Sequence, residues 1–152
     1  MFATRFFRRG VIVLTFHGPL MAREEIEDFT HTIQVESDRF IGASGGLDDF
    51  VNHSCDPNCV LGDARSGPRL VALRDIAPGE EVSFDYSTCI LAEPEIARCM
   101  CGAARCRGEI ASFWRLQSST RRRYLQLNAV PEFILESRPE QVITRRRKAA
   151  GY

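Results

Sequence analysis

Hydrophobic residues occur along this chain mostly in short runs or in alternation with polar residues, a pattern that predicts many short strands and few helices. Residues 11–16 form an apolar, β-branched run that stops at a His-Gly-Pro turn, and residues 70–73 form a second run. Residues 82–86 follow a Pro-Gly turn and predict a third strand. Alternation over residues 30–36 predicts a half-buried strand, and residues 40–41 predict a shorter one. The expected fold class is therefore mostly β (α+β).

Two segments show helical spacing instead. Residues 23–30 are charged and carry apolar side chains three positions apart, which predicts a short amphipathic helix. Aromatic and leucine residues interleaved with arginines predict another helix near residues 118–127, with Ser118 or Ser119 as its N-cap. The basic tail from Arg145 is expected to be frayed. We find no internal repeat, and 152 residues suit one domain.

The composition excludes several protein classes. Apolar residues make up 44% and charged residues 26% of the chain, which argues against disordered and fibrous proteins. The formal net charge of zero removes the usual reason to expect nucleic-acid or membrane-surface binding, and no apolar run has the roughly 20 residues needed to span a bilayer. We therefore expect an intracellular protein with no membrane contact and no direct nucleic-acid binding.

Charge is nevertheless segregated along the chain. Residues 107–152 hold ten basic and four acidic side chains, whereas residues 1–106 hold ten basic and sixteen acidic ones. An acidic body of this kind suits a basic peptide partner, although charges spread over a solvated face are the commoner outcome.

A cluster of cysteines is the strongest chemical signal from residue spacing. Cys99, Cys101 and Cys106 lie within eight residues. A disulfide between the first two would close a strained ring, and thiols inside a cell stay reduced, so a zinc site explains the spacing better than a disulfide or free structural thiols. Three thiolates leave a tetrahedral shell open. The candidates for the fourth ligand are the remaining cysteines, Cys55, Cys59 and Cys89, and spacing does not choose among them.

Two further features have ordinary interpretations when each is taken alone. Residues 52–58 are rich in Asn, Ser, Asp and Pro, which is typical of a turn, and His53 within them suits a metal ligand, a base or a hydrogen-bonded turn residue. Tyr86 ends a β-run, where a tyrosine is usually an interior aromatic with a bonded hydroxyl.

Taken together and in order, these segments resemble a known family. Residues 52–58, Asn-His-Ser-Cys-Asp-Pro-Asn, resemble the Asn-His-Ser-Cys-x-Pro-Asn signature of SET-domain protein lysine methyltransferases. Residues 79–86, Gly-Glu-Glu-Val-Ser-Phe-Asp-Tyr, are similar to the family's second signature, Gly-Glu-Glu-Leu-Thr-Phe-Asp-Tyr. The Cys-x-Cys-x4-Cys run of residues 99–106 resembles the post-SET zinc segment, and the Phe-Ala element at residues 2–3 resembles the family's opening. The resemblance covers residues 2–108.

This resemblance implies a SET fold of several small β-sheets with a threaded pseudoknot, which periodicity would not predict. It places the SET domain in residues 1–91, a post-SET zinc segment in residues 92–110, and a helical extension with a basic tail in residues 111–152. It also implies transfer of a methyl group from S-adenosylmethionine to a lysine of a protein substrate, without a metal at the reacting centre.

The resemblance assigns the site residues as well. It implies that Tyr86 is the catalytic residue and a cofactor contact, and that Asn52 and His53 also bind the cofactor. The structural zinc ligands it implies are Cys55, Cys99, Cys101 and Cys106. Cys59 and Cys89 match no family ligand and are expected to be small apolar residues.

The chain also departs from the family pattern. A Gly-x-Gly turn normally precedes the Phe-Ala element, and here the sequence begins at Met1-Phe2-Ala3. Three explanations fit: residues precede Met1, another segment or a second chain (a homodimer) fills the gap, or cofactor binding is lost. Phe16 stands where many members have a tyrosine. The alternative function is therefore a catalytically inactive, zinc-stabilised module that binds a basic peptide.

Overall fold

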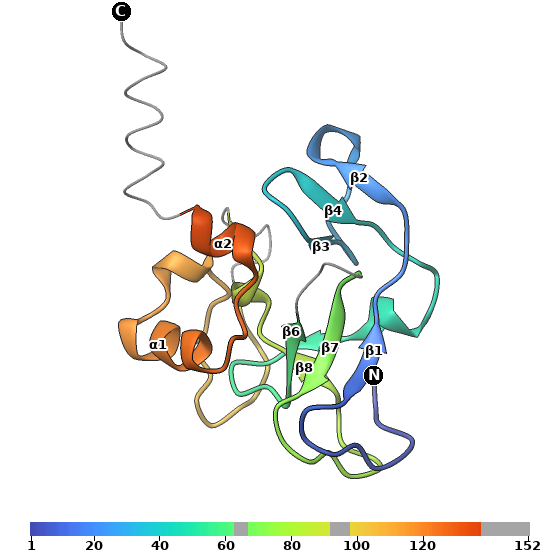
Figure 1. Ribbon diagram of the computed structural model, residues 1–152, viewed down its shortest axis with the longest axis vertical. Helices are drawn as coiled ribbons and strands as arrows, with labels where there is room; N and C mark the ends of the chain where they lie inside the picture. Colours follow the sequence, from blue (N-terminus) through green and yellow to red (C-terminus); the bar gives the residue numbers. More distant parts are fainter. Residues whose placement is uncertain (63–66, 92–97, 138–152) are drawn as a thin grey trace, which may run out of the picture.

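Three small β-sheets form the body of the protein in a computed structural model, which describes residues 1–62, 67–91 and 98–137 (Figure 1). The first sheet has the order β1 (Ile12–Thr15), β7 (Arg69–Ala72) and β6 (Cys59–Gly62), with antiparallel neighbours. Its strands confirm the expected runs at residues 11–16 and 70–73. The tail for which fraying was expected lies outside the described residues.

The second sheet is antiparallel and has the order β2 (Leu20–Ala22), β4 (Arg39–Ile41) and β3 (Ile33–Gln34). The strand expected over residues 30–36 is therefore confirmed as β3, which is only two residues long.

The third sheet joins the two signature segments. β5 (Asn52–His53) pairs in parallel with β8 (Ser83–Phe84), so that Asn52 lies opposite Ser83 and His53 lies opposite Phe84. Parallel pairing needs a long crossover, and here the crossover carries β6 and β7. Segments about 30 residues apart are thereby brought side by side.

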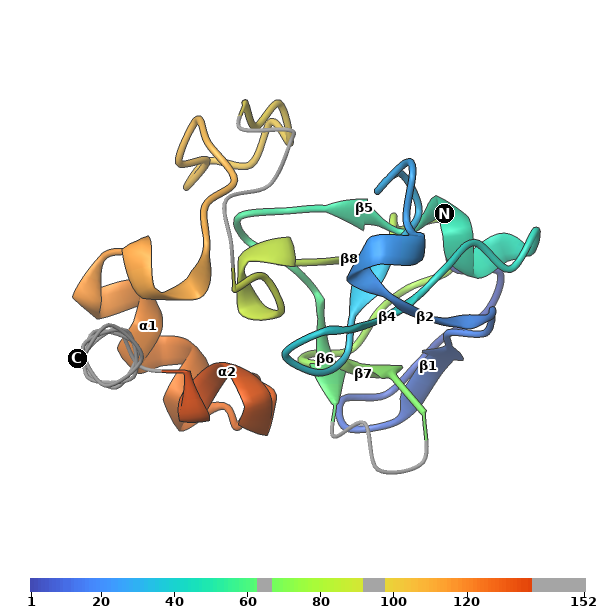
Figure 2. The same ribbon diagram turned by 90° about the horizontal axis from the view of Figure 1, so that it is seen from above.

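The helical elements are short. Within residues 1–62, 67–91 and 98–137 they are the 3-10 helices η1 (Arg23–Glu25), η2 (Leu47–Phe50), η4 (Tyr86–Thr88) and η5 (Phe113–Arg115), and the α-helices α1 (Ser118–Gln126) and α2 (Glu132–Glu136). Figure 2 shows α1 and α2 together on one side of the sheets. None of the described helices has the length and apolar character needed to cross a bilayer.

One main hydrophobic core joins the sheets to the C-terminal helices. Leu70 and Ile76 of the β-rich part are fully buried, and so are Phe113, Tyr124 and Ile134 of the helical part. Burying such large side chains stabilises each by about 1.5–3 kcal/mol relative to exposure. The helical part therefore packs as an integral part of the same body.

The helix expected over residues 23–30 is wrong, because only η1 forms there. Glu25 Oε2 accepts a hydrogen bond from the backbone N–H of Ala22, and Ile26 already has extended backbone angles. Asp28 then accepts a hydrogen bond from the Thr30 N–H through Oδ1, at 2.8 Å. Such local side-chain bonds compete with helical hydrogen bonds, which explains why the apolar spacing did not produce a full helix.

Two smaller corrections concern element ends. The N-cap of α1 is Gln117, and its side chain makes no capping bond, so neither Ser118 nor Ser119 caps the helix; Ser118 is already its first residue. The strand expected over residues 82–86 covers only β8, because Asp85 caps η4, which begins at Tyr86.

Candidate active site

Tyr86 lies in the wall of a cavity of about 330 Å³ at the meeting point of the second and third sheets. Its hydroxyl donates a 2.6 Å hydrogen bond to the backbone carbonyl of Val51. The ring packs against Phe84, with ring centroids 4.9 Å apart, and the ring of Phe16 meets Phe84 edge-on, with centroids 6.0 Å apart. The cavity therefore has aromatic walls and one phenol hydroxyl, with Phe16 contributing none.

The environment of Tyr86 keeps its hydroxyl protonated. Burial, with smaller contributions from the thiol of Cys89 and the carboxylate of Glu81, raises the pKa of Tyr86 to about 12. Because the proton points to the Val51 carbonyl, the lone pairs of the oxygen remain able to accept a hydrogen bond. Tyr86 is thus suited to orient a donor group rather than to remove a proton as a phenolate.

His53 connects this tyrosine to the cysteine cluster. Its Nδ1 accepts a 3.2 Å hydrogen bond from the backbone N–H of Tyr86, so in the neutral ring the proton is on Nε2. Nε2 lies 3.3 Å from the sulfur of Cys55 and donates to it. Burial is the main reason that the pKa of His53 lies below its ordinary value, which favours this neutral form.

Asn52 lies beside His53 on the exposed side. Its side-chain Nδ2 donates a 2.7 Å hydrogen bond to Glu81 Oε1, and the residue also lines the cavity. The structure therefore brings Asn52, His53 and Tyr86 close together; Asn52 and Tyr86 line the cavity, whereas His53 lies behind Tyr86 and is not part of the lining.

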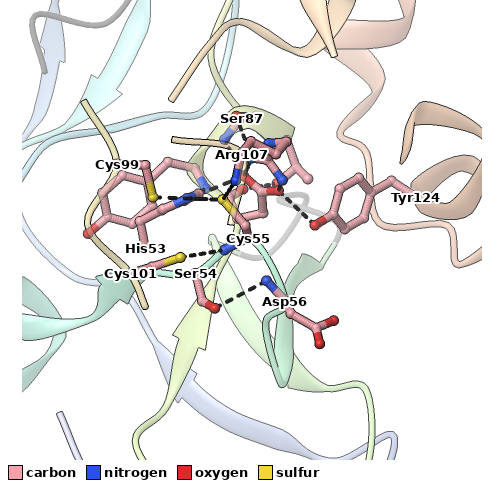
Figure 3. A network of polar contacts seen from close by, with 12 residues as sticks. His53, Ser54, Cys55, Asp56, Ser87, Cys99, Cys101, Arg107 and Tyr124 are labelled. Atoms are coloured by element: carbon pink, nitrogen blue, oxygen red, sulfur yellow. Dashed lines mark hydrogen bonds and ion pairs between the residues drawn. The ribbon is translucent and has the colours of Figure 1, made fainter. Parts of the chain in front are cut away.

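Four cysteine sulfurs gather on the other side of His53. The sulfurs of Cys55 and Cys99 lie 3.7 Å apart, and those of Cys99 and Cys106 also lie 3.7 Å apart. A zinc ion with Zn–S bonds of about 2.3 Å in a tetrahedron needs ligand sulfurs about 3.8 Å from one another. The cysteine spacing therefore fits such a metal. Figure 3 shows the side chains of His53, Cys55, Cys99 and Cys101 turned toward one another.

Backbone donors stabilise these sulfurs as thiolates. The backbone N–H of Cys55 donates to the sulfur of Cys101 at 3.5 Å, and that of Arg107 donates to the sulfur of Cys55 at 3.4 Å. Although burial opposes ionisation, hydrogen bonds from the backbone at Cys55 and Ala103 lower the pKa of Cys101 to about 6. Burial raises the pKa of Cys55, so Cys101 ionises first.

His53 competes with Cys106 for the fourth ligand position beside Cys55, Cys99 and Cys101. Its ring nitrogen and the sulfurs of Cys55, Cys99 and Cys101 all lie within 4.8 Å of one another. Coordination through Nε2 requires that atom to lose its proton, which moves the proton to Nδ1; the Tyr86 N–H already points there, although Asp85 Oδ1 also lies 3.5 Å from Nδ1. Cys106, close to Cys99, makes no such conflict.

The remaining cysteines lie elsewhere. Cys59 on β6 is fully buried, Cys89 is nearly so, and both belong to the main hydrophobic core. Cys89 also lines the cavity, and its thiol donates to the carbonyl of Tyr86. Their positions agree with the expectation that they are small apolar residues.

Sequence reasoning missed a buried ionic network beside the cysteines. Arg107 Nη1 and Nη2 contact the two carboxylate oxygens of Asp85 at 2.8 and 2.9 Å, and the Tyr124 hydroxyl donates to Asp85 Oδ2 at 2.7 Å. The only available signal was adjacency, because Asp85 precedes Tyr86 and Arg107 follows Cys106. Nothing in the pattern of residues 118–127 marked Tyr124 as a polar partner.

Known proteins resemble this chain over the same residues. Residues 1–87 match the family model described as "SET domain". Histone-lysine N-methyltransferase trr of Drosophila melanogaster is 31% identical over 124 residues, which cover 70% of this chain and 5% of the relative. An H3 lysine-4-specific histone-lysine N-methyltransferase of Saccharomyces cerevisiae is 37% identical over 86 residues, which cover 52% of this chain and 8% of the relative. The chain thus spans a small part of these relatives.

Solved structures share the fold. KRYPTONITE in complex with mCHG DNA and SAH superimposes with a TM-score of 0.58 at 25% identity, covering 72% of this chain and 26% of that one. The methyltransferase domain of human SETMAR superimposes with a TM-score of 0.57 at 24% identity, covering 72% of this chain and 52% of that one. The expected mostly β fold of small sheets is confirmed by these neighbours.

Proposed function

The chain belongs to the SET-domain family, and from that membership we propose that it is an S-adenosylmethionine-dependent methyltransferase acting on a lysine side chain of a protein substrate. Relatives named as histone-lysine N-methyltransferases support the reaction, and a neighbour that carries SAH supports the cofactor. The observation that carries the proposal is the Tyr86 hydroxyl, held by the Val51 carbonyl at the wall of the aromatic cavity.

The cavity suits the needs of a lysine amine. A lysine has a reference pKa of about 10.4, so the nitrogen must lose a proton before it attacks a methyl group. Apolar walls such as Phe16 and Phe84 disfavour the charged form and lower the amine pKa, whereas the carboxylates of Asp48 and Asp49, which also line the cavity, act in the opposite direction. The Tyr86 oxygen accepts a hydrogen bond from the amine and aligns it, so that positioning supplies most of the catalysis.

S-adenosylmethionine supplies the methyl group, activated by its sulfonium charge. We assign Asn52 and His53 as its contacts and Tyr86 as the residue nearest the transfer. An exposed amide beside a cavity with aromatic walls fits a ligand that combines polar groups with a ring.

We further propose that Cys55, Cys99, Cys101 and Cys106 hold one structural zinc ion. Their sulfur spacing and thiolate-stabilising backbone bonds support this set. Ile110, the last residue of the zinc segment, packs with Cys55 and Cys99 and also lines the cavity. The zinc segment therefore shapes one wall of the site and takes no part in the chemistry.

A basic, lysine-containing peptide is the substrate that these observations favour. The acidic excess in residues 1–106 attracts such a peptide, and a solved neighbour is described in complex with an H3(1-15) peptide. We propose that the protein acts inside the cell, where thiols stay reduced and a histone-like substrate is available.

The test is transfer of a labelled methyl group from S-adenosylmethionine to a histone H3 tail peptide by the full chain. The control peptide has arginine in place of every lysine. Label on the lysine peptide alone is expected. Calorimetric titration with S-adenosylmethionine is run in parallel. Binding of cofactor and peptide with no transfer would support the inactive module instead, and no binding of the cofactor would refute the proposal.

A further inference from the structure

The carboxylate of Asp85 joins three segments that are distant in sequence. It is 1% exposed, and it accepts hydrogen bonds from Arg107, from Tyr124 and from the backbone N–H of Ser87. A buried carboxylate needs such partners, because an unpaired charge away from water is strongly disfavoured. The network therefore links η4, α1 and the cysteine-rich segment, which is residues 99–106 with Arg107 directly after it.

Asp85 is also the residue that starts the helical turn carrying Tyr86. As the N-cap of η4, its Oδ1 accepts from the Ser87 N–H at 3.1 Å. The neighbouring N–H, that of Tyr86, donates to His53. The Asp85 side chain is thus connected to the backbone of Tyr86 by this cap, and its Oδ1 also lies 3.5 Å from His53 Nδ1, the atom that accepts from the Tyr86 N–H.

Arg107 connects the same carboxylate to the cysteine cluster. Its guanidinium contacts both oxygens of Asp85, while its own backbone N–H donates to the sulfur of Cys55. A bidentate pair of this kind has a defined geometry, so it fixes orientation as well as distance. Arg107 thus fixes the position of the cysteine-rich segment relative to η4.

Tyr124 completes the network from α1. Its side chain is 1% exposed, and burial together with the Asp85 charge raises its pKa, so the hydroxyl stays a donor. The preceding residue, Arg123, contacts Asp56 at 3.2 Å, and Asp56 directly follows Cys55. Figure 3 shows the hydroxyl of Tyr124 turned toward the group of side chains that includes Arg107. α1 therefore contacts both signature segments at once.

We propose that Tyr124 is a positioning residue for the methyl-transfer site: its hydroxyl, together with Arg107, holds Asp85 and thereby orients Tyr86. The inference rests on the proposed function. It assigns to α1 a part in the reaction, although no residue of α1 lines the cavity. Tyr124 and Arg107 act through Asp85, and Tyr86 remains the residue that touches the amine.

The experiment uses the full chain as wild type, Tyr124→Phe and Arg107→Lys, with Arg122→Ala as an exposed control on α1. Amide hydrogen exchange at Tyr86 and Ser87 is measured by NMR, and kcat and KM are measured with the H3 tail peptide. We expect Tyr124→Phe and Arg107→Lys to speed exchange at these two amides about ten-fold and to lower kcat about ten-fold, with KM little changed. Arg122→Ala should match the wild type.

Two results would overturn the inference. One is exchange and kcat in Tyr124→Phe equal to those of the wild type. The other is exchange that rises equally throughout the β1-β7-β6 sheet, because this shows general destabilisation. If Tyr124→Phe does not fold, Arg107→Lys decides by the same two criteria. If the wild type transfers no methyl group, the proposed function fails, and exchange at Tyr86 and Ser87 still tests the positioning.

Discussion

The sulfur atoms of Cys55 and Cys99 lie 3.7 Å apart, although 44 residues separate them in the chain. This contact joins the segment after β5 to the cysteine-rich segment, and it places Ile110 in the cavity wall. The proposed metal site and the wall of the candidate active site therefore share this part of the chain, and each is open to direct tests.

Removing the hydroxyl of Tyr86 should abolish most of the transfer. Tyr86→Phe keeps the ring packing against Phe84 and loses the oxygen that orients the amine, so we expect turnover to fall about 100-fold. Turnover is measured with labelled cofactor and the H3 tail peptide. A thermal melt serves as the control: loss of the hydrogen bond to the Val51 carbonyl should cost about 1 kcal/mol and leave the protein folded. Unchanged turnover in a folded Tyr86→Phe protein would remove Tyr86 from its assigned role.

Zinc content should depend on Cys101. Elemental analysis of the wild type is expected to find one zinc ion per chain, and Cys101→Ser should lose it together with order in the cysteine-rich segment. Cys59→Ala is the matched control, since Cys59 is buried in the main core away from the cluster, and it should keep its zinc. Full zinc occupancy in Cys101→Ser would show that the ligand set is wrong.

The identity of the fourth ligand can be decided between Cys106 and His53. We expect Cys106→Ser to weaken zinc binding by at least about ten-fold, and His53→Gln to retain one zinc ion, because His53 Nδ1 faces the Tyr86 N–H and keeps the proton on Nε2. Competition with a chromophoric chelator measures both affinities. The reverse order of effects would make His53 the ligand.

Asp48 should make stability depend on acidic pH. Its carboxylate is buried, which by itself raises the pKa, yet hydrogen bonds from the Ser44 hydroxyl and the His17 N–H hold the pKa of Asp48 below its usual value. In the window between the folded and unfolded pKa values the unfolded chain binds more protons, so this contribution is present above about pH 4 and is lost as the pH falls.

Urea unfolding at pH 6 and pH 3 checks this prediction. Asp48→Asn should be less stable than the wild type at pH 6, and the difference should shrink at pH 3. Asp38→Asn is the control, because Asp38 is exposed. An Asp48→Asn deficit that is the same at both pH values would contradict the assignment.

The local features of the fold were readable from the pattern of residues. Strands β1 and β7 follow from apolar runs bounded by turn residues, and α1 follows from its spacing. The segment at residues 23–30 shows the limit of this reasoning, since Asp28 and Glu25 use their side chains to bond the backbone and stop the helix after one turn. Apolar spacing indicates which faces are buried, but it does not show where side chains compete with the helix for backbone hydrogen bonds.

The sequence by itself determined the chemistry available to this protein: a run of three closely spaced thiols, an Asn-His pair, and a tyrosine at the end of a β-run, in the order that resembles the SET family. Only the tertiary structure decided which distant groups meet. The approach of Cys55 to Cys99, and of Tyr124 to Asp85, depends on the parallel pairing of β5 with β8 and on the packing of α1 against the core. Such contacts are set by the path of the whole chain, because burial of apolar surface constrains where segments lie without marking in any local pattern which polar groups will face each other.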